Sequence, residues 1–480
     1  MQFTLFTNTF LQELSESSQG ILAKPLKIAV KVLESPLGVP LVQAIEHDLN
    51  AHALRKKRRR SQDQVLRLLP GGRERTPPAV VYLLTVASGT LQDCFGQRGY
   101  AALVASSDLH RALACFGMRK VPGRSTCHEL VRAVTEKTLV GIIQAQLMIA
   151  KQEGLDDFKC VIGDSTATEA DSAKPNNARL FTHLAHRTHK AEQTLCGALK
   201  RQRGQKRVTH ALSQIDRLKY LLLATSNSAA ERIAYYDQLL EVGANLLTYF
   251  QRGFPMLCKA EGTAHEPLLD CLRQDYAALH EMWFQIYQEL YPNEDIGDPV
   301  TLRYSVADPD AAFIKKGHRP TVFGYRPHLA CSDAGLVVGM DLTSGNPSDA
   351  KRMLPLLSVI SEWTGTVPEA ASFDSGYCSK ANFAAAKASG IKTISFAGGK
   401  GRMLLGTDWD SAVMRHLRRR RNAIEALIGH FKQCYGLRRF YERNLKAARH
   451  QLLRSIIAYN FERTAVLLLR RLKAEEEDAA

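Results

Sequence analysis

Residues 158–168 read FKCVIGDSTAT, and this stretch decides the fold because it places a strand between long helical segments. Its first half is mainly apolar and includes the β-branched Val161 and Ile162, which is typical of a buried strand. Helical periodicity precedes the stretch and returns from residue 186. We therefore predict a strand that ends at Asp164.

More strands follow after residue 320, again with helices between them. In chain order we expect a hairpin of TVFGYRPHLA and GLVVGMDLTSG around the turn 331–334, and then a helix that is capped by residues 346–349, Asp349 among them, and runs to about 363. Strand PEAASFD (368–374), a helix at 379–389 and strand IKTISFA (391–397) follow. Asp374 ends the fourth strand. A hairpin followed by α/β units predicts an α/β layered domain with a mixed sheet.

Composition favours a soluble protein that binds a polyanion. The chain has 480 residues, of which 45% are hydrophobic and 23% charged, so several domains with ordinary cores are expected. The net charge of +16 is high for such a chain. Nucleic acid is the commonest partner of so basic a surface, although ribosome-associated and membrane-surface proteins share the property.

Cysteine usage and hydropathy restrict the compartment. The ten cysteines form no CxxC pair, which argues against a zinc ribbon and a disulfide scaffold and favours a reducing cytosol. No apolar run reaches the ~18 residues of a membrane span. The N-terminus lacks the basic start of a signal peptide. We therefore expect a cytoplasmic protein without a membrane partner.

A third acidic residue lies on an Arg-rich helical segment, RHLRRRRNAIEALIGHFKQCYGLRR (415–439). At ~100° per residue, one arc of a single helix would contain four charged residues. They are Arg418, Arg421, Glu425 and Lys432. An apolar stripe beside that arc would pack on the sheet. The segment therefore predicts one helix that presents a carboxylate flanked by cations.

The three acids suit phosphodiester chemistry. Asp164 and Asp374 end strands, and side chains there project into the crevice where ligands bind in open sheets. Two Mg²⁺ ions about 3.5–4 Å apart can activate a nucleophile and stabilise the leaving oxygen. Mg²⁺ prefers oxygen ligands and retains waters, so a few carboxylates suffice. Neighbouring arginines would then bind phosphate.

Several blocks resemble bacterial insertion-sequence transposases with an Asp/Asp/Glu active site. The blocks are DSTATE (164–169), RPTVFGYRPHL (319–329), SGNPSDA (344–350), FDSGY (373–377), and Arg421, three residues, Glu425, six residues, Lys432. The last block has the spacing of a subgroup signature of Tyr, Arg, Glu and Lys, but Arg418 stands at its Tyr position. The resemblance extends over about 159–470.

The resemblance implies a ribonuclease H-like, retroviral-integrase-like fold with a catalytic Asp/Asp/Glu set. Asp164, Asp374 and Glu425 would hold Mg²⁺ or Mn²⁺, as two ions. Arg418, Arg421 and Lys432 would contact DNA. Such transposases bind terminal inverted repeats, cleave double-stranded DNA at the element ends, and join the 3′-hydroxyl to target DNA by transesterification. A homodimer acting at the bacterial nucleoid is expected.

These expectations divide the chain into four parts. They are a helical DNA-binding or dimerisation region (1–150), a catalytic domain (151–185 with 301–440), a helical insertion (186–300), and C-terminal helices with an acidic tail (441–480). The insertion would separate the two aspartates.

Other polar features have a functional and a structural interpretation. They are Glu169 with Asp171 (auxiliary metal ligands or surface charges), His183 with His186 and His189 (zinc ligands or a polar helix face), His318 with Arg319 (phosphate contacts or a loop), and the basic run 55–60 (a DNA-contacting arm or a solvated face). A helix over 123–147, with a capping box of Thr126 and Glu129, would either enter a major groove or pack internally.

Two alternatives to a transposase remain open. One is a nuclease of the same fold that cuts DNA and never joins it, which a strand-transfer assay would detect. The other is a retired transposase that only binds DNA, for which binding without Mg²⁺-dependent cleavage is expected. The presence of all three acids favours an active enzyme.

Overall fold

The structure is a computed structural model, and its helices and strands belong to two compact units. It describes residues 5–63, 75–91, 93–172, 176–201, 203–224, 226–292, 305, 308–315 and 320–479, without the side chains of 57–63 and 479. One unit comprises Met1–Asp171 with Ala312–Ala480, and the other is Ser172–Ala311.

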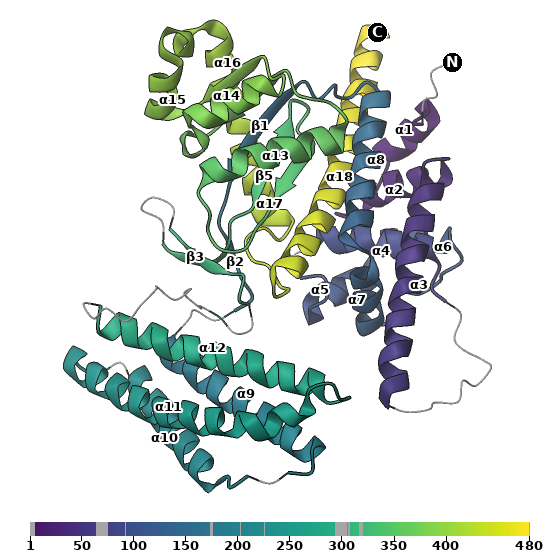
Figure 1. Cartoon of the computed structure of the whole chain (residues 1–480). Coiled ribbons are helices and arrows are strands. Elements are labelled where there is room, and N and C mark those ends of the chain that lie inside the picture. The colour runs from purple at the N-terminus through teal and green to yellow at the C-terminus, as the bar shows by residue number, and fades with distance from the viewer. Residues whose placement is uncertain are drawn as a thin grey trace. The chain divides into compact units, whose positions relative to one another are not determined.

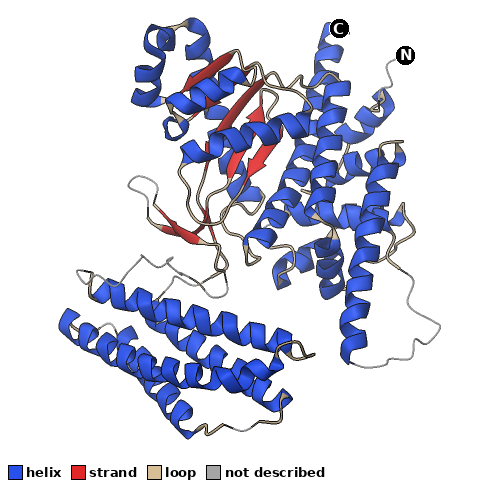
Figure 2. Ribbon diagram, viewed as in Figure 1, coloured by secondary structure: helices blue, strands red, loops and turns tan. Residues whose placement is uncertain are grey.

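A five-stranded mixed sheet forms the centre of the first unit (Figure 2). Its order is β6 (Val337–Asp341), β5 (His328–Ser332), β1 (Cys160–Ser165), β7 (Ala370–Phe373) and β8 (Thr393–Phe396). Strand β1 pairs antiparallel with β5 and parallel with β7. The β5–β6 pair is antiparallel and the β7–β8 pair is parallel. The predicted mixed sheet is confirmed.

The predicted strand 321–330 was wrong in one respect, because it is two strands in two sheets. Strand β4 (Val322–Tyr325) belongs to a small sheet of order β2–β4–β3, with β2 (Thr168–Glu169) and β3 (Ala312–Ile314). The chain leaves that sheet at Arg326–Pro327 and enters β5. Pro327 has no N–H to donate, which favours an interruption of the ladder there.

Helices pack on the five-stranded sheet at defined strands. Helix α13 (Asp349–Thr364) packs on β5 and β6, and α17 (Asn422–Cys434) packs on β1 and β5. Helix α14 (Lys380–Ala388), α15 (Gly398–Leu405) and α16 (Ala412–Arg420) contact β8. The end of β1 is closely packed against β7, because a Cβ on Gly163 would lie 2.4 Å from the Phe373 ring.

Among the described residues, eight helices precede the sheet, and one long helix lies after α17. They are α1 (Asn8–Ser15), α2 (Ala23–Glu34), α3 (Gly38–Asp63), α4 (Pro78–Thr90), α5 (Gln97–Ala105), α6 (Ser107–Ala114), α7 (Arg124–Ala133), α8 (Glu136–Gln152) and the C-terminal α18 (Leu445–Ala479). Helix α18 packs on α1, α2, α4, α8 and β6, and Figure 1 shows it in yellow beside α8. It therefore joins the N-terminal helices to the sheet.

The predicted helix over 123–147 is two helices, α7 and α8. The break lies at Val134–Thr135, where the Thr135 side chain accepts a hydrogen bond from the Thr138 N–H and caps α8. The predicted capping box was wrong, because Gly123 caps α7 and Glu129 instead accepts a hydrogen bond from Lys56 at 2.6 Å. Capping by Thr135 satisfies an otherwise unpaired donor at the new helix start.

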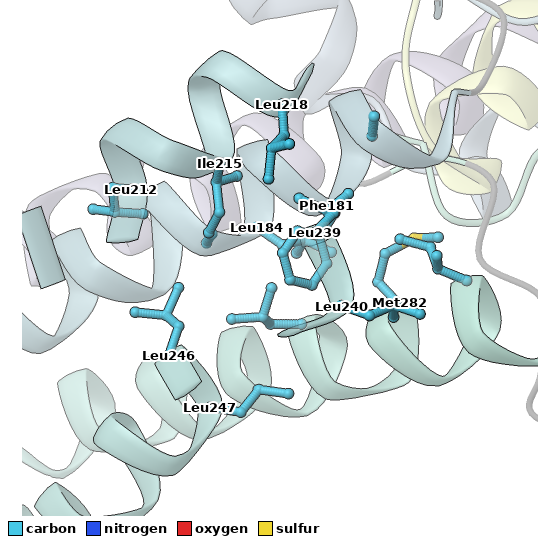
Figure 3. Close-up of a cluster of buried hydrophobic side chains, with 14 of the residues drawn as sticks. Phe181, Leu184, Leu212, Ile215, Leu218, Leu239, Leu240, Leu246, Leu247 and Met282 are labelled. Carbon is cyan, nitrogen blue, oxygen red and sulfur yellow. The ribbon is translucent and has the colours of Figure 1, made fainter. Parts of the chain in front are cut away.

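The second unit is a bundle of four long helices. They are α9 (Asn177–Ala198), α10 (Lys206–Leu223), α11 (Ala229–Leu257) and α12 (Glu266–Leu290). Leucines and Phe181 from these helices form its core (Figure 3). The predicted insertion 186–300 lies within this unit. The unit begins earlier than predicted, at Ser172. Its first helix, α9, also begins earlier, at Asn177, and is capped by the Asn176 side chain.

Among the helices of the described residues, none is by itself long and apolar enough to cross a membrane. The pair Ala23–Glu34 and Gly38–Lys56 meets the length and composition criteria together, with a bend of 96°.

A buried histidine on α18 generates a testable prediction about pH. His450 donates from Nε2 to the Val134 carbonyl oxygen at 2.9 Å, and burial lowers its pKa to about 4. The unfolded chain therefore binds more protons than the folded chain between pH about 6.5 and about 4. We expect acidification over this range to remove on the order of 3 kcal/mol of unfolding free energy through His450.

Urea unfolding at pH 7 and pH 4 tests this expectation. The His450→Gln variant should be less stable than the wild type at pH 7 and should lose less stability on acidification. Parallel pH curves for the two proteins would contradict a neutral, buried His450.

Candidate active site

Asp164 and Asp374 lie at the same edge of the sheet. Asp164 is the fifth residue of β1, and Asp374 directly follows β7. These strands are parallel neighbours, so their carboxyl ends meet. The Asp164 side chain is 10% exposed and that of Asp374 is 32% exposed. Strand order thus brings together two carboxylates that are far apart in the sequence.

The guanidinium of Arg421 lies close to the carboxylates of all three predicted acids. Its Nη1 lies 3.6 Å from Asp164 Oδ2 and 3.7 Å from Asp374 Oδ1. Its Nη2 donates to Glu425 Oε1 at 2.6 Å. Glu425 is in the first turn of α17 and its side chain is 54% exposed. One guanidinium therefore lies among three carboxylates.

This cluster has more negative than positive formal charge. Three carboxylates around one guanidinium leave two formal negative charges at a partly buried site. Like charges held this close repel strongly unless cations compensate them. Within the described part of the chain, no three His, Cys, Asp or Glu side chains group as a metal site. The guanidinium lies where the carboxylates point, and their oxygens are the ligands that Mg²⁺ prefers.

The predicted single helix over 415–439 was wrong, since it is broken at Arg421. Helix α16 ends at Arg420 and α17 begins at Asn422. Arg418 therefore does not share a helix face with Glu425. Its guanidinium lies 3.5 Å from the Trp409 ring centroid and donates to the Trp409 carbonyl oxygen. Lys432 is on α17, seven residues after Glu425.

Asp349 supports the end of β1 from α13, and the sequence analysis assigned it only a helix-capping role. Its Oδ1 accepts a hydrogen bond from Ser165 Oγ at 3.0 Å and one from Arg326 Nη1 at 3.3 Å. A Cβ on Gly376 would lie 2.5 Å from Asp349 Oδ2. Asp349 thus connects the segment after Asp164 to the segment after Asp374.

A neutral pair lies beside this carboxylate. His328 Nδ1 and the Tyr377 hydroxyl share a hydrogen bond at 2.6 Å. Burial lowers the pKa of His328 to about 4 and raises the pKa of Tyr377 well above its usual value of 10. Both groups are therefore uncharged at neutral pH. The pair fills the space under the strand ends without adding a charge.

Asp171, His186 and His189 have structural partners. Asp171 pairs with Arg439 at 2.9 Å and with Arg443 at 3.5 Å. His186 bonds Asp216 at 2.9 Å, and His189 lies 3.7 Å from Glu192. These contacts favour the structural interpretation of Asp171 and of the histidine series on α9.

For the remaining predicted DNA or metal contacts, the structure describes few side-chain interactions. Glu169 is exposed at the end of β2, where its backbone pairs with Arg439. His318 and Arg319 lie outside the described residues. In the basic run, Lys56 pairs with Glu129, and the side chains of 57–60 lie outside the described set. None of these observations tests a DNA contact.

Comparison with known proteins finds a similarity to one family over part of the chain. Residues 300–461 match the family model of the transposase DDE domain. The match contains Asp374 and Glu425, whereas Asp164 precedes it. It supports a DDE transposase family, for which a ribonuclease H-like fold is implied. The subgroup signature stays a prediction. No curated protein and no solved structure matches the chain.

Replacement of Asp349 tests its structural role. Asp349→Asn leaves Arg326, whose side chain is 12% exposed, without its carboxylate partner. We expect a loss of about 1–3 kcal/mol of unfolding free energy, because a hydrogen-bonded, partly buried charge pair is broken. Chemical denaturation measures it.

The matched control is Asp157→Asn. Asp157 pairs with Lys159 at 3.6 Å, and both side chains are more than half exposed. A change within about 0.5 kcal/mol is expected there. Equal effects of the two substitutions would contradict the role assigned to Asp349.

Proposed function

We propose that this chain is a DNA transposase that cleaves DNA at element ends and joins the resulting 3′-hydroxyl to target DNA. The observation that carries the proposal is the convergence of Asp164, Asp374 and Glu425 on Arg421. The match to the transposase DDE domain supports the same conclusion.

The three carboxylates would hold Mg²⁺ or Mn²⁺, and they fit the role as oxygen donors with uncompensated charge. When bound, two such ions would activate the attacking oxygen and stabilise the leaving oxygen. Asp164 is the most constrained donor, since its Oδ1 accepts the Ser165 backbone N–H at 2.6 Å. Glu425 is the most exposed donor and can adjust its position.

Arg421 has two tasks in this proposal. Without a divalent cation, its guanidinium compensates part of the acidic charge, as the three distances indicate. With metal and DNA bound, it would turn toward a phosphate, for which its planar fork of donors is suited. Its location at the junction between α16 and α17 leaves its backbone outside both helices.

The reaction has two phosphoryl-transfer steps at the same acids, a hydrolysis followed by a transesterification. In the first, water attacks a phosphodiester at the element boundary and a 3′-hydroxyl leaves. In the second, that hydroxyl attacks a phosphodiester of target DNA, and the target 3′-oxygen leaves. The number of phosphodiester bonds is unchanged in the second step, so no ATP is required. Arg418 and Lys432 are proposed DNA contacts.

The proposal also includes how the DNA ends are recognised and how two ends are paired. The N-terminal helices, several of which pack on α18, would recognise the inverted repeat. Two ends must be brought to one target, so the active complex would be a homodimer.

Cleavage of an end-containing duplex in Mg²⁺ tests the assignment. The isosteric changes Asp164→Asn, Asp374→Asn and Glu425→Gln should each reduce cleavage at least about 10³-fold, because each removes a charge that acts in the transition state. DNA affinity measured without divalent metal should stay within about twofold of wild type, or increase, since repulsion of phosphate is removed.

The exposed Asp157→Asn change is the control and should cleave as wild type does. Wild-type nicking by Asp164→Asn would refute the proposed active site. Cleavage without joining of a pre-processed 3′-hydroxyl end would favour a nuclease. DNA binding without cleavage by the wild type would favour a protein that only binds DNA.

A further inference from the structure

The helical unit contains a strongly basic segment that the active site does not involve. Residues 200–207 read KRQRGQKR, with five basic residues and no acidic one. The unit as a whole, residues 172–311, has equal numbers of basic and acidic residues. Positive charge is therefore concentrated at the α9–α10 connection.

A cavity of about 340 Å³ lies beside this segment, between the start of α10 and the second half of α11. Its charged lining residues are Arg203, Arg207 and Arg252, and its polar ones are Asn245, Thr248 and Tyr249. None of the described residues that line it is acidic. The spacing of 245, 248, 249 and 252 places these four side chains on one face of α11.

Arg203 fixes the basic segment to the bundle. Its guanidinium stacks on the Tyr249 ring, 4.1 Å from the centroid, and donates to the Tyr249 carbonyl oxygen at 2.8 Å. It also pairs with the buried Glu192. A Cβ on Gly253 would lie 1.8 Å from Arg203 Nη1, so a side chain there would displace the guanidinium. The charge of Arg203 is thus used within the fold.

Arg207 and Arg252 differ from Arg203 in this respect. Both side chains are exposed, and among the described residues neither has an acidic partner within ion-pair distance. They extend from two different helices, α10 and α11, which also contribute Leu212 and Leu246 to one hydrophobic core (Figure 3). Two guanidiniums are therefore presented on a rigid base.

We propose that this cavity binds the phosphate backbone of double-stranded DNA. Arginine forks recognise phosphate oxygens, and Asn, Thr and Tyr side chains commonly supply the remaining phosphate hydrogen bonds. Such contacts position a duplex and carry no sequence information. The inference rests on the proposed function, and it assigns the helical unit a sequence-independent role in holding DNA.

Salt-dependent DNA binding by the full chain tests the proposal. A fluorescent duplex of arbitrary sequence is titrated with wild type and with Arg207→Ala/Arg252→Ala, without divalent metal, at several salt concentrations. Loss of two phosphate contacts should lower the slope of log K against log salt by about 1.8 and weaken binding about tenfold or more near 0.1 M salt. Arg207→Lys/Arg252→Lys should restore most of the slope.

The matched control is Arg217→Ala/Arg232→Ala, which removes two exposed arginines of α10 and α11 that do not line the cavity. It should change affinity by less than about twofold. Thermal unfolding of both double variants should match wild type, because all four side chains are exposed.

Three other outcomes would each overturn the proposal, and the binding data distinguish them. If Arg207→Ala/Arg252→Ala binds DNA as the control does, this inference fails while the proposed function stands. If the wild type binds no DNA, both fail together. If the double change weakens binding of an RNA duplex but not of DNA, the cavity has a different nucleic-acid partner.

Discussion

The parallel pairing of β1 with β7 is the interaction on which the candidate site depends. It brings Asp164 and Asp374 to one edge of the sheet. Gly163 permits the contact with Phe373 that keeps these strands close. Helix α13 then stabilises both strand ends through Asp349, and α17 supplies Glu425. Three segments distant in sequence thereby form one acidic cluster.

Electrostatic repulsion is the cost of that arrangement, and Arg421 offsets part of it. The guanidinium reaches all three acids because it lies between two helices and not within one. Beside the cluster, His328 and Tyr377 are uncharged, as their pKa directions show. The mostly buried Asp349 and Arg326 pair with each other there, so they add no net charge.

Sequence reasoning predicted most strands of the larger sheet, and it predicted three acids that the structure brings together, because local signals were strong there. Strand ends, turn residues and the Arg421–Glu425–Lys432 spacing are all visible in the printed sequence. It missed the break at Arg421, because helical periodicity continues across it. It underestimated Asp349, since a helix-capping position does not disclose a partner on another strand. The anchoring of Arg203 was likewise invisible, because Tyr249 and Gly253 are remote in sequence.

The position of the helical unit has a consequence for how the chain folds. Strand β1 cannot pair with its antiparallel neighbour β5 until the whole of residues 172–311 has been synthesised. Contacts within α9–α12 join segments that are closer in sequence than β1 and β5 are, so they are expected to form before the β1–β5 pair closes. An early, compact bundle would shorten the effective loop that this closure must order. The helical unit would then act as a kinetic aid to assembly of the sheet.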